Sequence, residues 1–226
     1  MKKLLFLVFT ILLSAESYGQ LYVGLKGGGN VSEATFRNNP DYRLKRAILR
    51  QGFQGGLVLR YVNQNNAGIQ AEINYVQKGW NETVDTVVNV NTRYSRQVDY
   101  LEIPVLAHIY LGRKKFRIIL DMGPYVGLAL NATEFIRNEI TQEEISNRYV
   151  FDRDRDNRID YGLMAGGGFE KDFKFGTIYA EARYTFGFAD FNRDKSEQLE
   201  LSQNRTISIS VGYLYTLRAR KKSDPE

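Results

Sequence analysis

Hydrophobic and polar residues alternate with a period of two near the C-terminal end of the chain. Within residues 206–217, isoleucine, valine, tyrosine and leucine fill the odd positions from Ile207 to Leu217, and threonine, serine or glycine fills most even positions. Segments 69–75 and 177–187 repeat this pattern. A period of two, with β-branched and aromatic residues, predicts strands that have one apolar and one polar face.

The strand pattern recurs in eight segments, joined by connections that alternate in length. The predicted strands are 21–29, 52–62, 67–78, 97–111, 116–131, 158–172, 175–189 and 205–217. The short connections are 63–66, 112–115 and 173–174, and the long ones are 30–51, 79–96, 132–157 and 190–204. Outer-membrane barrels have short turns on one rim and long loops on the other. The sequence therefore predicts an all-β fold, an eight-stranded antiparallel up-and-down transmembrane β-barrel with both chain ends on the short-turn rim.

A soluble β-sandwich is the main alternative, because its strands share the same alternation. Sandwich strands usually have about five or six residues, and the strands predicted here are longer. The chain also has 15 tyrosines and 13 phenylalanines, many of them near predicted strand ends. Two aromatic girdles at the membrane interfaces require this placement, so the membrane barrel is favoured.

The N-terminal residues have the features of a secretory signal. Lys2 and Lys3 precede an apolar stretch, Leu4 to Leu13, which is too short to span a bilayer as a helix. We predict a signal peptide at 1–19, an outer-membrane barrel at 20–217 and a charged periplasmic tail at 218–226. The mean hydropathy of −0.39 argues against a helical membrane protein but is compatible with a barrel, in which only alternate residues face lipid.

Charged residues recur on the face of the strands that is predicted to point inward. These residues are Lys26, Arg60, Glu72, Glu102, Arg117, Asp121, Glu170, Glu181 and Arg183. Because an eight-stranded barrel is only wide enough inside for side chains, we expect them to pair with one another and fill it as a polar plug. The alternatives are a selective ion path or a catalytic carboxylate pair.

No motif predicts a catalytic, cofactor or metal site. The single histidine, His108, shares the inward face with Glu102, but no nucleophile elbow accompanies it. Asp152, Asp154 and Asp156 resemble the start of a calcium loop, yet Leu163 stands where that loop requires glutamate. The chain has no cysteine, which removes disulfides and thiolate chemistry. We expect no enzymatic activity.

Several short motifs resemble those of a known family. They are Val23-Gly24-Leu25-Lys26-Gly27-Gly28, Gly52-Phe53-Gln54-Gly55-Gly56, Gln77-Lys78-Gly79-Trp80, Tyr100-Leu101-Glu102-Ile103-Pro104 and Gly167-Gly168-Phe169-Glu170. Together they resemble the PorT-like outer-membrane β-barrel family of Bacteroidetes-type bacteria. The resemblance implies an outer-membrane location and, for the subgroup of the namesake, a role in type IX protein secretion. The chain departs from many barrels by ending in a charged tail instead of an aromatic residue.

The net charge of +5 raises the question of a nucleic-acid partner. The basic residues do not gather on one predicted strand face, and the export signal argues against such a partner. We expect Arg43, Lys45, Arg46 and Arg50, in the first long loop, to contact lipopolysaccharide or a partner protein, because arginine binds phosphate through a bidentate fork. The expected function is a structural, assembly or secretion-associated role, and the alternative is passage of small solutes or ions.

Overall fold

The computed structural model of the 226-residue chain describes residues 19–37, 47–63, 66–84, 92–112, 116–138, 140–152, 156–190 and 200–218. These residues form the strands β1 Gln20–Arg37, β2 Ala47–Ile48, β3 Arg50–Val62, β4 Ala67–Val84, β5 Thr92–Leu111, β6 Phe116–Asn138, β7 Glu144–Tyr149, β8 Ile159–Phe173, β9 Gly176–Gly187 and β10 Glu200–Arg218. In this part of the chain, no helix is long and apolar enough to cross a membrane.

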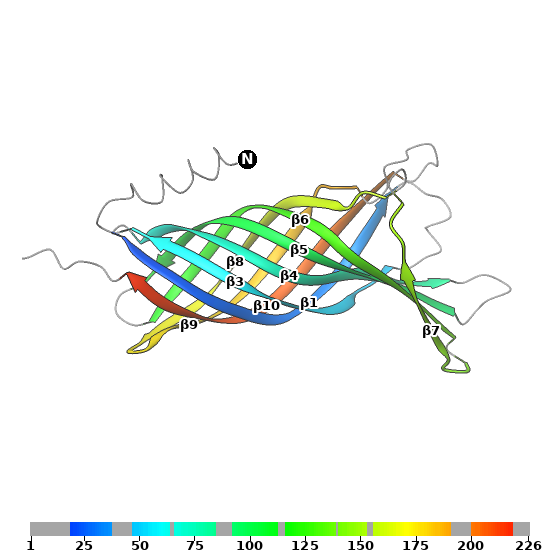
Figure 1. Cartoon of the computed structure of the whole chain (residues 1–226), viewed down its shortest axis with the longest axis horizontal. Coiled ribbons are helices and arrows are strands. Elements are labelled where there is room, and N and C mark those ends of the chain that lie inside the picture. The colour runs from blue at the N-terminus through cyan, green and yellow to red at the C-terminus, as the bar shows by residue number, and fades with distance from the viewer. Residues whose placement is uncertain are drawn as a thin grey trace, which may run out of the picture.

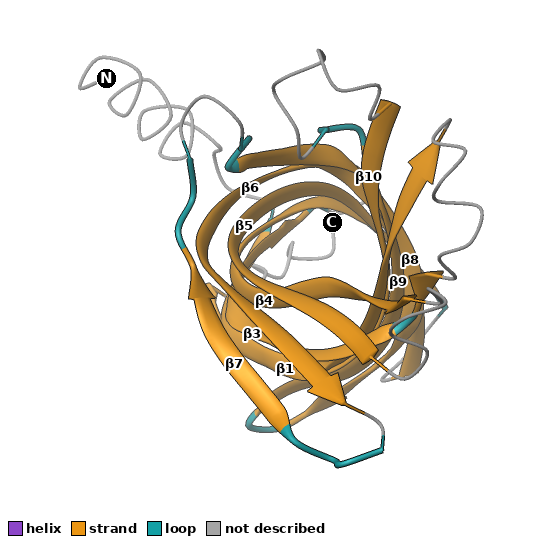
Figure 2. Ribbon diagram, turned by 90° about the vertical axis from the view of Figure 1, so that its right-hand side faces the viewer, coloured by secondary structure: helices purple, strands orange, loops and turns teal. Residues whose placement is uncertain are grey.

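Eight strands form a closed ring in which every neighbouring pair is antiparallel. The order is β4-β3-β1-β10-β9-β8-β6-β5, and a further pairing of β4 with β5 closes the ring. β1 and β10, the first and last strands in the sequence, pair directly with each other. The predicted eight-stranded antiparallel barrel is confirmed, and its closed outline is visible along the barrel axis in Figure 2.

The short connections all lie at one end of the barrel. At this rim β3, β5 and β8 end and β4, β6 and β9 begin, and the start of β1 and the end of β10 lie there too (Figure 1). The register agrees, since Gln20 pairs with Val62 and Leu21 pairs with Arg218. Because short turns face the periplasm in outer-membrane barrels, we call this end the periplasmic rim and the opposite end the extracellular rim.

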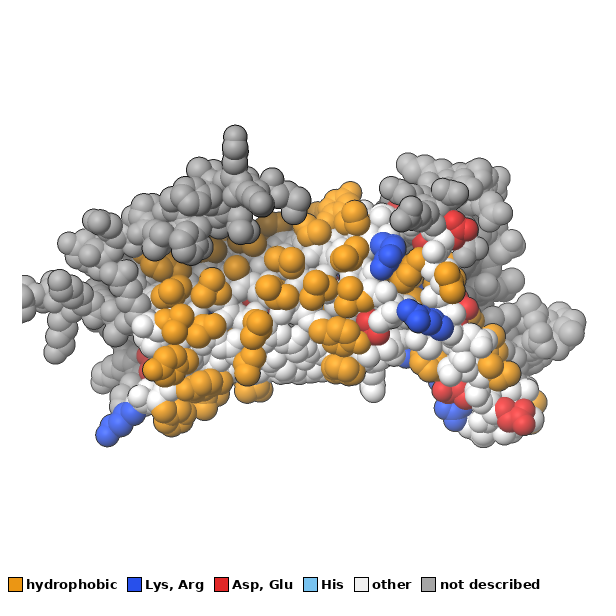
Figure 3. All heavy atoms as spheres, viewed as in Figure 1, with side chains coloured by type: hydrophobic (Ala, Val, Ile, Leu, Met, Phe, Trp, Pro, Cys, Tyr) orange, Lys and Arg blue, Asp and Glu red, His pale blue; other side chains and the backbone are white. Residues whose placement is uncertain are grey.

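The outer surface of the ring is apolar, as a lipid-facing wall requires. Leu25, Met122 and Ile209 point outward and are 62%, 65% and 65% exposed. Figure 3 shows that hydrophobic side chains cover the visible barrel wall, whereas charged side chains gather near the extracellular rim. These outward side chains have no protein core to pack against, so contact with lipid accounts for them.

Aromatic side chains mark both ends of the apolar wall. Near the periplasmic rim, the rings of Phe116 and Phe169 stack with centroids 5.7 Å apart. Toward the extracellular rim, the rings of Phe53 and Tyr75 lie 5.7 Å apart. Aromatic rings favour the membrane–water interfaces, so these pairs lie where interfacial girdles belong.

Several strands extend further on the extracellular side than predicted. Residues 79–84 and 92–96 were predicted to be part of a connection, but they belong to the paired ends of β4 and β5 and extend both strands. Likewise β6 continues to Asn138 and pairs with β7, inside the predicted connection 132–157. The sheet therefore extends beyond the closed ring, and Figure 1 shows this extension at the end of the barrel where β7 is labelled.

Candidate functional site

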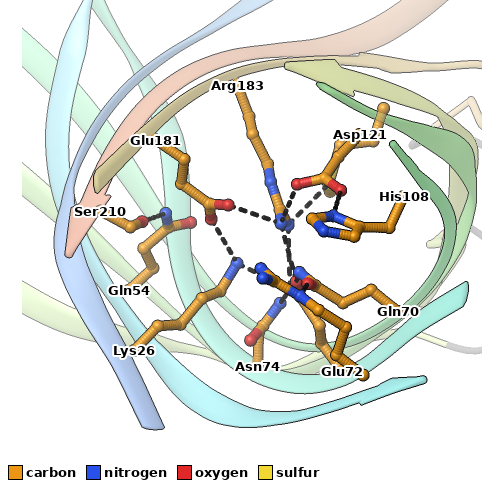
Figure 4. Close-up of polar contacts among 12 residues, drawn as sticks. Lys26, Gln54, Gln70, Glu72, Asn74, His108, Asp121, Glu181, Arg183 and Ser210 are labelled. Carbon is orange, nitrogen blue, oxygen red and sulfur yellow. Dashed lines mark hydrogen bonds and ion pairs between the residues drawn. The ribbon is translucent and has the colours of Figure 1, made fainter. Parts of the chain in front are cut away.

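The charged side chains form three layers across the barrel interior, and the largest lies at its centre. Arg183 on β9 donates to Glu72 on β4 at 2.8 and 3.0 Å and to Glu181 at 2.8 Å, and its Nη2 lies 3.4 Å from Asp121 on β6. Lys26 on β1 lies 2.6 Å from Glu72 and 3.2 Å from Glu181. Two cations and three carboxylates from four strands therefore meet in one network, seen down the barrel in Figure 4.

Polar neighbours complete the central layer on the side of β4 and β5. Asn74 donates to Glu72 at 2.8 Å, and Gln70 donates to the other carboxylate oxygen of the same residue. His108, which is 1% exposed, places its Nδ1 2.7 Å from Asp121. The central carboxylates thus have hydrogen-bonding partners, which buried ions need to offset the loss of water.

The second layer lies nearer the periplasmic rim. Arg60 on β3 lies 2.6 Å from Glu170 on β8, and Arg117 on β6 lies 2.6 Å from the other oxygen of the same carboxylate. Arg117 also lies 2.7 Å from Asp172, and Arg60 donates to Gln70 at 2.5 Å. Since Gln70 also bonds to the central layer, it connects the two layers.

The third layer lies nearer the extracellular rim and centres on a lysine. Lys78 on β4 forms ion pairs with Glu102 on β5 and with Asp160 on β8, the latter at 3.1 Å. Asn204 on β10 donates to the same Asp160 at 3.1 Å. The ammonium group of Lys78 also lies 4.8 Å from the ring centre of Tyr125, within the range of a cation–π contact. A single cation therefore links opposite parts of the wall.

All nine charged residues expected inside the barrel have their side chains there. Eight are buried, and Arg117, next to the periplasmic mouth, is partly exposed. Sequence reasoning missed three charged partners: Lys78 and Asp160 inside the barrel, and Asp172 near its periplasmic mouth. Lys78 has the same parity as Glu72, and Asp160, within the predicted strand 158–172, has the same parity as Glu170, so the alternation could have identified both.

The described residues leave little free volume beside the second layer. The cavity beside Arg60, Arg117 and Glu170 measures about 10 Å³, which is close to the space of one water molecule. A larger cavity of about 380 Å³ opens at the periplasmic rim, beside Tyr22 and Asp172. The charged layers lie between this mouth and the extracellular side, so the large cavity does not continue through the described part of the barrel.

A cluster of aromatic and charged residues lies above the third layer, on the inner side of the extended sheet. The guanidinium carbon of Arg96 lies 4.2 Å from the ring centre of Tyr149, and Arg96 also pairs with Glu134. Burial, reinforced by its hydrogen bond to Glu134, raises the pKa of Tyr94, so its phenol remains a donor to that carboxylate. Tyr149 and Phe151 pack against the buried cluster below, which closes this side of the extracellular mouth.

Of the four basic residues expected to contact lipid A or a partner protein, Arg50 alone is described. Its guanidinium donates to Ser95 and to Gln97, the latter at 2.8 Å, and lies 5.0 Å from the ring centre of Phe135. Arg43, Lys45 and Arg46 lie outside the described residues.

The aspartates that resemble a calcium loop are arranged differently from such a loop. Asp156 accepts hydrogen bonds from the backbone N–H of Asp152 at 2.8 Å and from Tyr149, and Asp154 is not described. Asp160 points into the barrel toward Lys78. Among the described residues, no group of three or more histidines or carboxylates could hold a metal ion.

A closed ring with an apolar wall, a polar interior and short turns on one rim defines the class of outer-membrane β-barrels. The chain belongs to the outer membrane protein beta-barrel domain family, whose profile matches residues 14–193. The protein is therefore an outer-membrane barrel.

Solved structures of bacterial barrels resemble the chain at low sequence identity. OprG from Pseudomonas aeruginosa is 13% identical, with a TM-score of 0.49 over 90% of this chain and 98% of its own. Ail from Yersinia pestis, in complex with the heparin analogue sucrose octasulfate, is 15% identical, with a TM-score of 0.41 over 87% and 99% of the two chains. Neisserial surface protein A is 10% identical, with a TM-score of 0.44 over 87% and 97%. No curated protein matches the chain significantly.

Proposed function

We propose that this protein is a closed outer-membrane barrel with a structural or assembly role, whose extracellular sheet contacts a partner in the cell envelope. The observation that carries the proposal is the packing of three ion-pair layers across the barrel, with room for about one water molecule beside Arg60 and Arg117. Side chains packed in this way fill the barrel and leave no wide path through it. The protein's surface, and the long extracellular strands above all, then carries the function.

A role in type IX secretion is the more specific form of this proposal. It is supported by the resemblance of two motifs, Gln77-Lys78-Gly79-Trp80 and Leu101-Glu102-Ile103-Pro104, to PorT-like proteins. These motifs supply Lys78 and Glu102, which pair with each other inside the barrel. The motif residues therefore have a structural role, and the secretion role requires a test of its own.

A deletion strain provides that test. Loss of the gene is expected to reduce secreted and surface proteins, and a photo-crosslinking residue at Ile140, which is 73% exposed in the β6–β7 turn, is expected to capture a neighbour. The same residue at Phe175, exposed on the periplasmic rim, is the control for non-specific capture. Normal secretion together with no neighbour specific to position 140 would contradict the assembly role.

Passage of a small solute or ion is the second candidate function. It is favoured by buried polar atoms with no hydrogen-bond partner among the described residues, including His108 Nε2, Tyr179 Oη and Arg183 Nε. Water molecules would satisfy such atoms, and a chain of them would form a narrow polar path. Slower nutrient uptake in the deletion strain, with normal secretion, would favour this function over assembly.

We also propose that the first long loop contacts the phosphates of lipopolysaccharide. Alanine at Arg43, Lys45, Arg46 and Arg50 together is expected to weaken lipopolysaccharide binding by the refolded barrel, because phosphate contacts of arginine and lysine are lost. Alanine at Lys171 and Lys174, which lie near the periplasmic rim, is the control. Unchanged binding in the four-fold variant would show that these side chains do not contact the phosphates.

A further inference from the structure

The β6–β7 hairpin has an edge that no described strand covers. β7 pairs with β6 on one side, and no other strand of the described chain pairs with it. Residues 144–148 are all exposed. In the view along the barrel, β7 lies at the outer margin of the molecule and runs across the view (Figure 2). An uncovered edge presents unpaired N–H and C=O groups and can receive another strand.

The register of the hairpin identifies which backbone groups face this edge. Asn138 N donates to Glu143 O at 3.0 Å, so these two residues form a hydrogen-bonded pair. Hydrogen-bonded pairs recur at every second residue of an antiparallel ladder. Ile145 pairs with Ile136 in this register and bonds to β6. The N–H and C=O groups of Glu144, Ser146 and Arg148 therefore point to the uncovered edge.

These three residues are complementary to the same three residues of a second copy that runs in the opposite direction. When two copies of β7 run antiparallel with Ser146 opposite Ser146, Glu144 of each copy lies opposite Arg148 of the other. This register pairs the same residues whose backbone groups are free, and it gives about six hydrogen bonds, two for each hydrogen-bonded pair. Opposite charges directly across a strand pair stabilise it, and like charges destabilise it.

We propose that β7 is a docking edge for a second copy of this chain, which joins two barrels through a sheet that is continuous across a two-fold axis at Ser146. An isologous contact of this kind uses the same surface on both copies. Two copies in one membrane carry β7 at the same height, as a two-fold axis along the membrane normal requires. Within each copy, Glu144 also lies opposite Arg137 on β6, so its carboxylate would stand between two arginines.

Cysteine crosslinking tests the register directly, because the chain has no cysteine of its own. Residues in a hydrogen-bonded antiparallel pair have Cα atoms about 5.5 Å apart, within the range of a disulfide. In the full-length protein in native outer membranes, Ser146→Cys is expected to give a disulfide-linked dimer under mild oxidation. The matched controls are Asn147→Cys, which would oppose Ile145 of the second copy, and Ile140→Cys, at the exposed hairpin turn. The dimer fraction from Ser146→Cys is expected to exceed both controls several-fold.

Charge exchange tests the pairing independently of the cysteine geometry. In the Ser146→Cys background, Glu144→Arg or Arg148→Glu alone is expected to lower the dimer fraction by at least half. The double exchange Glu144→Arg with Arg148→Glu is expected to restore it, since the opposite charges are again paired. Each variant is first checked for the heat-dependent gel shift of a folded barrel.

Three results would overturn the proposal: equal crosslinking at 140, 146 and 147 in folded protein, no rescue by the double exchange, or crosslinking of position 146 to a different protein only. The test is independent of the proposed assembly role, because a barrel can dimerise whether or not secretion depends on it.

Discussion

At the scale of single residues, the interior is an arrangement of shared ions, in which most charged groups contact two or more partners. Glu72 contacts both Lys26 and Arg183, and Glu170 contacts both Arg60 and Arg117. When a buried ion loses its partner, the free-energy cost of its lost hydration is no longer offset by an ion pair. The interior should therefore be most sensitive to substitutions that leave opposite charges without a partner.

Lys78→Met provides a direct test of this sensitivity. The side chain of Lys78 is 1% exposed and is the cation shared by Glu102 and Asp160. Removing its charge is expected to destabilise the barrel by about 3–5 kcal/mol, the usual cost of breaking a buried ion pair. Urea unfolding in micelles measures the change, with Lys174→Met, in the exposed turn between β8 and β9, as the control. Equal stability of the two variants would show that the third layer contributes little.

Parity in the sequence was enough to place charges on the inner face, because neighbouring strand residues point to opposite sides of the wall. It could not assign partners, since the pairs join strands that are distant in sequence: 155 residues separate Lys26 from Glu181. Asp160 was missed for a different reason. It lies inside the predicted strand 158–172 with the parity of the inward Glu170, but it closely follows the three aspartates that resemble a calcium loop and was not counted among the inward charges.

At the scale of elements, glycines allow close contact between β1 and β10. A Cβ on Gly28 would lie 1.9 Å from the carbonyl oxygen of Ile209, on the backbone of β10. A Cβ on its neighbour Gly27 would meet only the carbonyl oxygen of Gln54, at 3.8 Å. Gly28 therefore permits close packing of the two strands that close the barrel.

The two neighbouring glycines form a matched pair for mutation. Gly28→Ala is expected to reduce the folded fraction strongly, because the neighbouring backbone must move to admit the methyl group. Gly27→Ala points outward and is expected to fold like the wild type. The fraction of protein that shows a heat-dependent gel shift measures the folded fraction of each variant. A normal folded fraction for Gly28→Ala would contradict the close approach of β1 to β10.

The element boundaries were predicted well inside the membrane and poorly beyond the extracellular rim. Lipid requires an apolar outward face, so alternation marks the strands clearly along the lipid-facing wall. Residues 92–97 read Thr-Arg-Tyr-Ser-Arg-Gln and lack that apolar face, yet they continue β5. The extension is held by pairing with β4 and β6, which single-sequence periodicity does not reveal.

At the scale of the whole molecule, the chain combines a closed wall with a filled interior and a sheet that extends beyond one rim. The wall fixes the protein in the outer membrane, and the three ion-pair layers occupy the space that a pore would need. The extended strands provide the surface that the proposed partner would contact. A closed interior is the central claim, because it decides between the structural role and the alternative role in transport.

Conductance across a planar bilayer tests most directly whether the interior is closed. The refolded protein, verified by its heat-dependent gel shift, is expected to show no large and steady openings, because Arg183 and its carboxylate partners cross the lumen. Steady openings in the wild type, with an ion selectivity that changes in Glu181→Ala or Arg183→Ala, would contradict the closed interior and establish a conducting path through the charged layers.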